Sequence, residues 1–166
     1  MTSTMTTKQG GYGAGAVIQL VNFLVDNEEY GVEVLKVREI IRMTDVTRVP
    51  NAPDFVDGVF NLRGKVIPII SLRKRLALPL VAYDSNTRII VIDLDNDLTG
   101  IIVDSVAEVI RITSEDIQPA PEGTAQDNNG SLFSGLVNRG ERLLILLSLD
   151  MLLNCYTLKS GDAVNH

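Results

Sequence analysis

Acidic side chains are the residues of this chain whose spacing could support chemistry. Asp93, Asp95 and Asp97 alternate along one segment, and Asp104 follows eleven positions after Asp93. A calcium loop would need Gly at its sixth position and normally a bidentate Glu at its twelfth, and neither residue stands there. Alternating acids could also form a general acid–base pair. A β-turn explains them better, because residues 26–28 repeat the same pattern of acids and Asn.

Histidine and cysteine, which most nucleophilic and metal sites require, are nearly absent. His166 is the single histidine and the last residue, so a Ser-His-Asp or Cys-His arrangement cannot be assembled. Cys155 is the single cysteine and follows an apolar segment, which favours a buried structural thiol over a nucleophile. The sequence has no Cys/His cluster, phosphate-binding glycine loop or nucleophile elbow. It therefore predicts a non-enzymatic protein without catalytic residues, metal or cofactor.

Charge and hydropathy restrict the possible partners. The formal net charge of −6 weighs against nucleic acid, because binding its phosphates requires clustered Lys and Arg. The one basic run, at residues 73–75, is interpreted as a solvated helix face. No apolar run approaches the roughly 18–20 residues that span a bilayer, so no direct membrane insertion is expected. The lone cysteine and the lack of a visible secretory signal are typical of the cytoplasm.

The elements that must position any site occur twice in the chain. Residues 26–50 reappear at 95–119 with ten identities at one offset of 69. Residues 58–76 match 135–153 at an offset of 77, and the eight extra residues fall in 122–131, which is interpreted as a loop insertion. This period is too long for a solenoid repeat, so the sequence indicates two copies of one small domain.

Each copy contains five short segments that are typical of β-strands. They are rich in β-branched and apolar residues and are separated by turn-forming residues, as at Arg63–Gly64. Five short antiparallel strands predict a small closed barrel without a long unpaired edge. The expected strands are 17–25, 30–35, 39–43, 55–62 and 65–72 in the first copy, and 88–94, 99–104, 108–112, 132–138 and 142–149 in the second, with helical segments at 35–39, 72–76 and 150–154.

The predicted fold class is all-β: two five-stranded barrels related by internal duplication, with short helical turns. The expected organisation is a disordered tail at 1–16, a first barrel at 17–82, a second at 83–154 and a C-terminal tail at 155–166. A barrel of about 60 residues is marginal alone, so the two are expected to pack side by side. Their junction should form a groove suited to binding.

The long stretch 28–73 resembles the CheW family of bacterial chemotaxis coupling proteins. The resemblance is carried by EEYG, LKVREI, VTRVPNAPDFVDGVFNLRG and VIPIISLR, in this order and spacing. The second half adds TGIIVDSVAEVIRI, QPAP and RLLILLSLDMLL. The similarity covers about residues 17–154. One position departs from the family pattern: Ser71 stands where the family commonly has an acid before Leu-Arg.

This resemblance implies a pair of SH3-like barrels around a hydrophobic seam, and a non-enzymatic adaptor. Such proteins join the cytoplasmic tips of chemoreceptors, the methyl-accepting chemotaxis proteins, to the regulatory domain of the CheA histidine kinase. It also implies a cytoplasmic protein that is recruited to membrane-associated receptor arrays. A small-ligand-binding double barrel is the alternative function.

The family's partner-binding surface carries over to Val37, Glu39, Gly58 and Arg63, and Val106 is the counterpart of Val37 in the second copy. Arginine suits such a surface because its planar five-donor fork often anchors interfaces. Structural roles remain open for the same positions. Arg63 could form a local cap or an ion pair with Glu39, Gly58 could be a backbone device, and Val37 could belong to the core.

Overall fold

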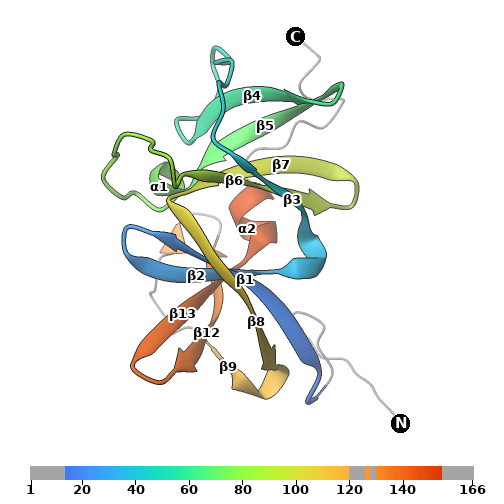
Figure 1. The fold of residues 1–166 in the computed structure, drawn as a ribbon, viewed down its shortest axis with the longest axis vertical. Coiled ribbons are helices and arrows are strands. Elements are labelled where there is room, and N and C mark those ends of the chain that lie inside the picture. The colour runs from blue at the N-terminus through green and yellow to red at the C-terminus, as the bar shows by residue number, and fades with distance from the viewer. Residues whose placement is uncertain (1–13, 120–125, 128–129, 155–166) are drawn as a thin grey trace.

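The computed structural model describes residues 14–119, 126–127 and 130–154. Within them the chain forms two large β-sheets, one above the other in Figure 1. Sheet A has the order β8 (Ser105–Thr113), β1 (Val17–Val25), β2 (Glu28–Glu33), β13 (Arg142–Leu147), β12 (Phe133–Arg139) and β9 (Ile117–Gln118). Sheet B has the order β3 (Val37–Arg42), β6 (Arg88–Leu94), β7 (Asp97–Val103), β5 (Lys65–Ser71) and β4 (Val56–Leu62).

Short elements connect the strands. They are η1 (Val34–Lys36), α1 (Leu72–Arg75), η2 (Ser114–Asp116), α2 (Leu149–Asn154) and a two-stranded ribbon of β10 (Gln126–Asp127) and β11 (Gly130–Ser131). The ribbon lies in the predicted insertion, and most of that insertion lies outside the described residues. The all-β prediction and the predicted strands are confirmed, with boundaries shifted by a few residues at most.

Sharp turns end the first hairpin of each copy. Asp26 and Asn27 have φ angles of 53° and 68°, and Asp95 and Asn96 have 52° and 73°. Two consecutive positive φ angles are typical of the two-residue hairpin turn whose twist matches that of the strands, and Asn and Asp tolerate this conformation. The acidic hairpin residues therefore form β-turns, as the sequence indicated.

The two copies exchange strands between the sheets. The first copy contributes β1 and β2 to sheet A but β3, β4 and β5 to sheet B. The second copy contributes β6 and β7 to sheet B but β8, β12 and β13 to sheet A. Equivalent parallel pairs, β2 with β13 and β7 with β5, join the contributions in each sheet. The sheets thus have the same strand pattern, each built from both copies.

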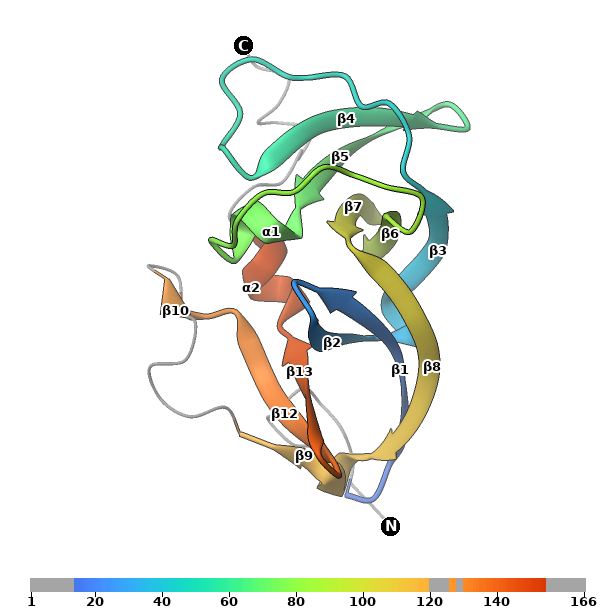
Figure 2. The ribbon, with the colours of Figure 1, turned by 60° about the vertical axis from the view of Figure 1, so that its left-hand side comes forward.

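The predicted division into barrels 17–82 and 83–154 does not follow this sheet topology. Sheet B is one continuous segment from β3 to β7, whereas sheet A takes its strands from before and after it. In Figures 1 and 2 the chain leaves the lower sheet after β2 and returns to it through β8. The sequence repeat shows which segments are alike, but it does not show which strands pair. In this structure each sheet contains strands from both copies, so the repeat boundary is not the boundary between barrels.

Each sheet is closed into a barrel by the segment that follows its edge strand. In sheet B the chain after β3 returns to β4, where Thr47 and Val59 exchange backbone hydrogen bonds of 2.9 and 2.8 Å. In sheet A the chain after β8 passes through η2 to β9, which pairs with β12. Closure removes the unpaired edges that an open five-stranded sheet would expose.

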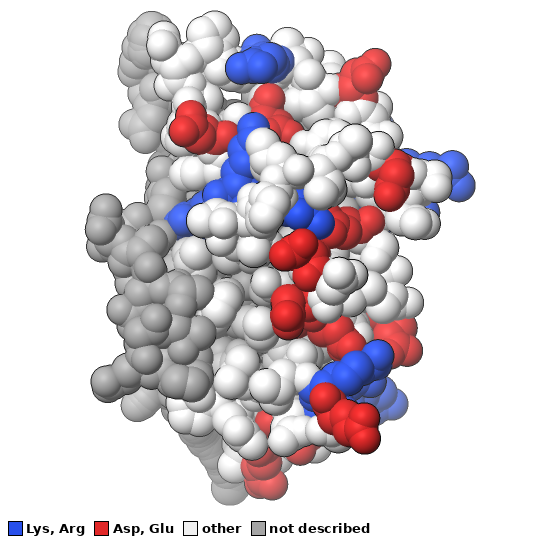
Figure 3. Space-filling model, turned by 90° about the vertical axis from the view of Figure 1, so that its left-hand side faces the viewer, with Lys and Arg blue, Asp and Glu red and all other residues white. Residues whose placement is uncertain are grey.

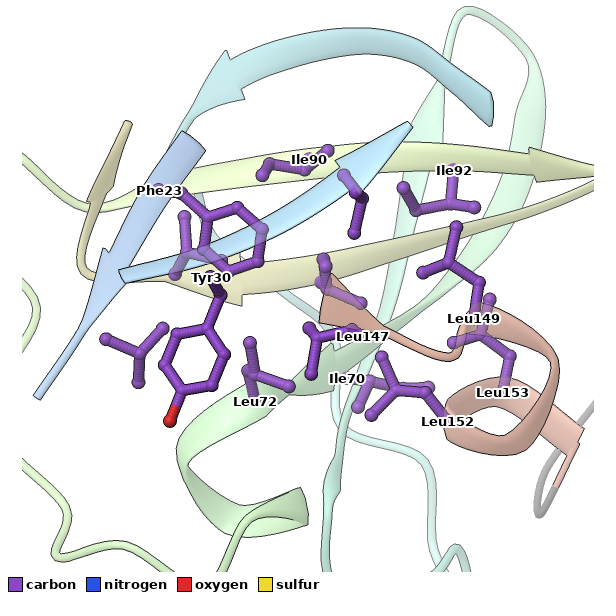
Figure 4. Packing of buried hydrophobic residues seen from close by; sticks show 14 of the residues in the cluster. Phe23, Tyr30, Ile70, Leu72, Ile90, Ile92, Leu147, Leu149, Leu152 and Leu153 are labelled. Atoms are coloured by element: carbon purple, nitrogen blue, oxygen red, sulfur yellow. The ribbon is translucent and has the colours of Figure 1, made fainter. Parts of the chain in front are cut away.

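One apolar core joins the two sheets. It contains Phe23, Tyr30 and Ile70 from the strands, and it receives Leu149, Leu152 and Leu153 from α2. Figure 4 shows these side chains converging between the strands, and the rings of Phe23 and Tyr30 stack with centroids 5.9 Å apart. Within the described residues, packed core around α2 thus fills the interior of the junction between the barrels, and a binding groove on its surface stays a prediction.

Candidate partner-binding surface

Glu39 and Arg63 form the centre of the candidate surface. Glu39 lies on β3, Arg63 lies in the turn between β4 and β5, and their charged groups form an ion pair. The Arg63 side chain is still 70% exposed. Exposed ion pairs contribute about 0–1 kcal/mol to stability, so this one is not a major stabilising contact. The local ion pair that the sequence left open is present, and it leaves Arg63 accessible to a partner.

The β4–β5 turn holds Arg63 in a defined backbone conformation. Arg63 and Gly64 have φ angles of 50° and 90°, as a two-residue hairpin turn requires. The side-chain Oδ1 of Asn61 accepts a hydrogen bond from the backbone N–H of Gly64 at 2.8 Å. Arg63 therefore stands at the tip of a tight and internally bonded turn.

Gly58 has a backbone role in this structure. It is buried in β4 with a φ of 152°, and a Cβ built on it would lie 2.1 Å from the carbonyl oxygen of Thr47. Real Cβ contacts never approach this distance, so only glycine lets the Thr47 segment close the barrel of sheet B. The structure thus supports a backbone role for Gly58, and its role in partner binding stays a prediction.

Val37 and Val106 occupy equivalent places in different sheets. Val37 begins β3 opposite Ile92, Val106 lies on β8 opposite Phe23, and each pairing has a bulge one residue later. Both valines are partly buried and pack against the shared core. The structure thus brings Glu39 and Arg63 together and places Val37 on the same strand as Glu39, but Val106 belongs to sheet A.

Sheet A repeats the glutamate–arginine pair with a different exposure. Glu108 is the sequence equivalent of Glu39, and its carboxylate lies 3.6 Å from the guanidinium of Arg139. The second copy lacks the Leu of Asn-Leu-Arg-Gly, so Arg139 ends a strand instead of entering the turn. Its side chain is consequently only 27% exposed. Because Arg-Gly occurs in both copies, the sequence could have indicated Arg139 as the counterpart of Arg63.

A buried carboxylate that the sequence pattern did not predict holds Arg139 in place. Glu29 on β2 accepts hydrogen bonds from Arg139 at 3.3 Å and from the buried Asn22 at 3.1 Å. It also pairs with Arg142 at 2.8 Å. The corresponding residues of the other copy, Val91 and Leu98, are apolar and pack in the core of sheet B. The two barrels thus differ in interior chemistry at equivalent places.

Ser71, which departs from the family pattern, caps the helix that carries Arg73. Its Oγ accepts a hydrogen bond from the Lys74 N–H at 3.3 Å, as Ser148 Oγ does from Met151. Arg73 itself binds the carboxylate of Asp104 through two hydrogen bonds of 3.0 and 2.6 Å. The geometry around Arg73 is therefore defined without an acid at position 71.

The pKa of Asp104 is below its ordinary value. Partial burial alone would raise this pKa, but the hydrogen bond from Arg73, the N–H of Asp26 and the positive charge of Arg73 together lower it. A depressed folded-state pKa adds stability that is present above the unfolded value of about 3.9 and lost as the pH falls through the folded value.

We therefore expect the wild-type protein to lose stability more steeply than Asp104→Asn between about pH 5 and about pH 2, because in this range only wild-type unfolding is coupled to proton uptake by the Asp104 carboxylate. Urea unfolding followed by circular dichroism at a series of pH values measures the difference. The two curves of unfolding free energy against pH should converge in acid. Parallel curves over the whole range would contradict the assignment.

An open groove of about 1350 Å³ lies on the sheet-B side of the molecule. Its walls are the segment between β3 and β4 and the segment after α1. Asp57 stands between Lys74, at 3.1 Å, and the hydroxyl of Tyr83, at 2.5 Å. Burial first, and then the Asp57 carboxylate, raise the pKa of Tyr83 above its ordinary value. These polar groups satisfy one another and present no free acid–base pair.

The described residues offer neither a metal-binding cluster nor a membrane-spanning helix. Among the described residues, no group of three or more His, Cys, Asp and Glu side chains could hold a metal ion. No helix in the described ranges has both the length and the hydrophobicity to cross a bilayer. Cys155 and His166 lie outside the described residues.

Comparison with known proteins identifies the family. The CheW-like domain model matches residues 19–155, almost the whole described chain. This chain belongs to the CheW family. The chemotaxis protein CheW of Klebsiella aerogenes is 46% identical over 142 residues, which cover 86% of this chain and 85% of that protein. The Helicobacter pylori protein of the same name is 39% identical and covers 82% of both chains.

A solved structure agrees with this membership. The crystal structure of the scaffolding protein TtCheW from Thermoanaerobacter tengcongensis superposes with a TM-score of 0.75 at 32% identity, covering 81% of this chain and 91% of that one. The CheW-family prediction and the chemotaxis adaptor role are therefore confirmed, and the small-ligand alternative is not favoured.

Proposed function

We propose that this protein joins the cytoplasmic tips of chemoreceptors to the regulatory domain of the CheA histidine kinase, with no enzymatic activity of its own. Its place would be the cytoplasm, at membrane-associated receptor arrays. Membership of the CheW family supports this proposal across the full double barrel. The ion pairs of the described residues support the part of the proposal that concerns enzymatic activity. Each carboxylate discussed above is bound by a cation or a backbone donor, so none is presented as a catalytic acid or base.

The exposed Glu39–Arg63 pair is the observation that carries the proposal. It stands at the end of the sheet-B barrel, and the apolar side chain of Val66, two residues after the turn, is 57% exposed. Interfaces commonly combine an apolar centre with an arginine that binds through its planar fork. Arg63 would exchange or share its bond to Glu39 with an acceptor on the partner.

The affinity of each single contact is expected to be modest, whereas the assembled array is expected to be stable. A micromolar dissociation constant corresponds to about −8 kcal/mol. When one adaptor holds two partners that are themselves part of an array, each bound partner raises the effective concentration of the next. Stability of the array would then come from many contacts made together.

Titration calorimetry with the isolated CheA regulatory domain, and separately with a receptor-tip fragment, tests the proposal. Binding to both, at distinct sites that do not compete, is the expected result. Binding to neither partner would remove the proposal.

Arg63→Ala is expected to weaken binding to one partner by more than about fivefold, which is over about 1 kcal/mol, and to leave the fold intact. Alanine has the same Cβ as arginine, so the positive φ at this position costs no more than before. Calorimetry measures the affinity, and circular dichroism the fold.

The matched control is Arg38→Ala. Arg38 is also an exposed arginine of this barrel, and its ion pair with Asp93 spans 2.9 Å. Arg38 lies between Val37 and Glu39 on β3, but its side chain pairs with Asp93 of β6 and not with Glu39 or Arg63. Its removal should therefore change affinity by less than about twofold. Equal losses in both variants, or a large fall in melting temperature for Arg63→Ala, would assign Arg63 a structural role only.

A further inference from the structure

The chain passes between the two sheets twice, and the two crossings are built differently. The first crossing is η1, between β2 and β3, and the second is Asp104, between β7 and β8. At the offset of 69 that relates the copies, Asp104 corresponds to Leu35 of η1, which is 92% exposed. The β7–β8 crossing therefore carries a charged side chain, Asp104, at the position where η1 carries the solvent-exposed apolar side chain of Leu35.

Asp104 is bound to three separate parts of the fold. Its carboxylate accepts both bonds of the Arg73 fork from α1, which follows β5 of sheet B. The same carboxylate accepts a hydrogen bond from the backbone N–H of Asp26, in the β1–β2 turn of sheet A, at 2.8 Å. Its own N–H donates to the carbonyl of Leu24 at 3.0 Å. Sheet A, sheet B and the crossing thus meet at one carboxylate.

Arg73 is buried, so the interpretation of residues 73–75 as a solvated helix face was wrong for this residue. Its side chain is only 10% exposed, its third nitrogen donates to the carbonyl of Pro79 at 2.5 Å, and Asp26 lies 3.6 Å away. Figure 3 shows the molecule from the α1 side, where basic and acidic side chains adjoin one another near the middle of the face. The equivalent of Arg73 in the second copy is Asp150, which is exposed. We call the contact between Arg73 and Asp104 the clasp, and the second copy cannot form its counterpart.

A clasp of this kind supplies something that the shared core does not. Burial of apolar surface is favourable in many relative orientations, because the hydrophobic effect is non-directional. A bidentate arginine–carboxylate bond fixes both distance and angle. The core holds the two sheets together, whereas the Arg73–Asp104 bond is directional, as are the hydrogen bonds from Arg75 of α1 to the carbonyls of Met151 and Leu152 of α2.

We propose that Arg73 is a positioning residue, which sets the relative orientation of the two barrels through Asp104 and touches no partner itself. The consequence for signalling rests on the proposed function: partner surfaces on different sheets would be held at the angle that lets both partners bind together. Without the Arg73–Asp104 contact, the relative orientation of the two barrels would vary, with η1 as the hinge.

Distances between spin labels test the geometry without any partner. Labels on cysteines placed at Val66 of β5 and Val109 of β8 report across the sheets, and labels at Val109 and Leu143 report within sheet A. All three residues are exposed, and Cys155→Ser provides the background. For Arg73→Met, pulsed electron paramagnetic resonance should show a broader distance distribution for the first pair only.

Three further variants make the outcome decisive. Arg38→Met removes an ion pair confined to sheet B and should leave both distributions narrow. Arg73→Lys keeps the charge without the fork and should give an intermediate width. If Arg73→Met fails to fold, Asp104→Asn provides the same test with the carboxylate charge removed. An unchanged Val66–Val109 distribution in a folded clasp variant, or equal broadening of both pairs, would overturn the proposal.

A binding assay separates this inference from the proposed function. Arg73→Met should bind the CheA regulatory domain alone and the receptor tip alone within about twofold of wild type, but lose about tenfold in receptor affinity when the kinase domain is already bound. A matching loss in the single-partner assays would place Arg73 in a contact surface and contradict its positioning role. If the wild-type protein binds neither partner, the proposed function fails, whereas the spin-label result still decides the clasp.

Discussion

Replacing Gly58 with alanine is expected to lower the free energy of unfolding by about 3–5 kcal/mol, which approaches the whole stability of a small domain. The new Cβ would overlap the carbonyl oxygen of Thr47, and the backbone φ of 152° adds conformational strain. Relief requires the Thr47 segment to leave β4, which breaks the Thr47–Val59 hydrogen bonds and opens the barrel. Urea unfolding monitored by circular dichroism measures the loss.

Gly64→Ala is the matched control for Gly58→Ala. Gly64 has a positive φ of 90°, but no atom lies within 4 Å of a Cβ built there. Only the backbone cost should appear, about 1 kcal/mol. Similar losses for both variants would show that contact with Thr47 is not the cause. Because Gly58 supports the barrel next to the Arg63 turn, weaker partner binding by its variants must be judged against their stability.

Leu152→Ala is expected to cost about 2–5 kcal/mol of unfolding free energy, through lost burial and the cavity that remains. Leu152 is fully buried on α2, within the core that both sheets share. Unfolding should remain cooperative. Sheets A and B should unfold in one transition, because the core that contains the new cavity belongs to both sheets. Denaturation followed by circular dichroism, together with amide exchange in β1 and β6, measures it.

Leu35→Ala provides the comparison for the core variant. The Leu35 side chain is 92% exposed in η1, so its truncation should change stability by less than about 0.5 kcal/mol. Two separated transitions in Leu152→Ala, with one sheet retaining its exchange protection, would show that the sheets have independent cores.

Local sequence was a reliable guide to the elements. The strand at residues 17–25 and the strand at 88–94 have the predicted bounds, because runs of β-branched residues end at Asp-Asn turns. Both turns take the positive φ angles that these residues tolerate. The information for a strand and its turn lies within about ten residues, which is why pattern alone suffices here.

The candidate surface was predictable only in part. The family motif led to Glu39 and Arg63, which form an ion pair, but it gave no sign that Glu29 would anchor Arg139. Glu29 and Arg139 are separated by 110 residues, and their contact depends on the parallel pairing of β2 with β13. No local pattern encodes a pairing between strands so far apart in the chain.

The sequence by itself determined the duplication, the all-β class, the strands and the adaptor family, because each is written in local pattern or in ordered motifs. Tertiary structure alone decided that the copies exchange strands, that core fills their junction and that Arg73 meets Asp104. A repeat states which segments are alike, and both self-contained and exchanged pairings satisfy it. In this structure the exchanged strands surround one core that both copies share, and this core buries apolar surface that a single small barrel would leave exposed.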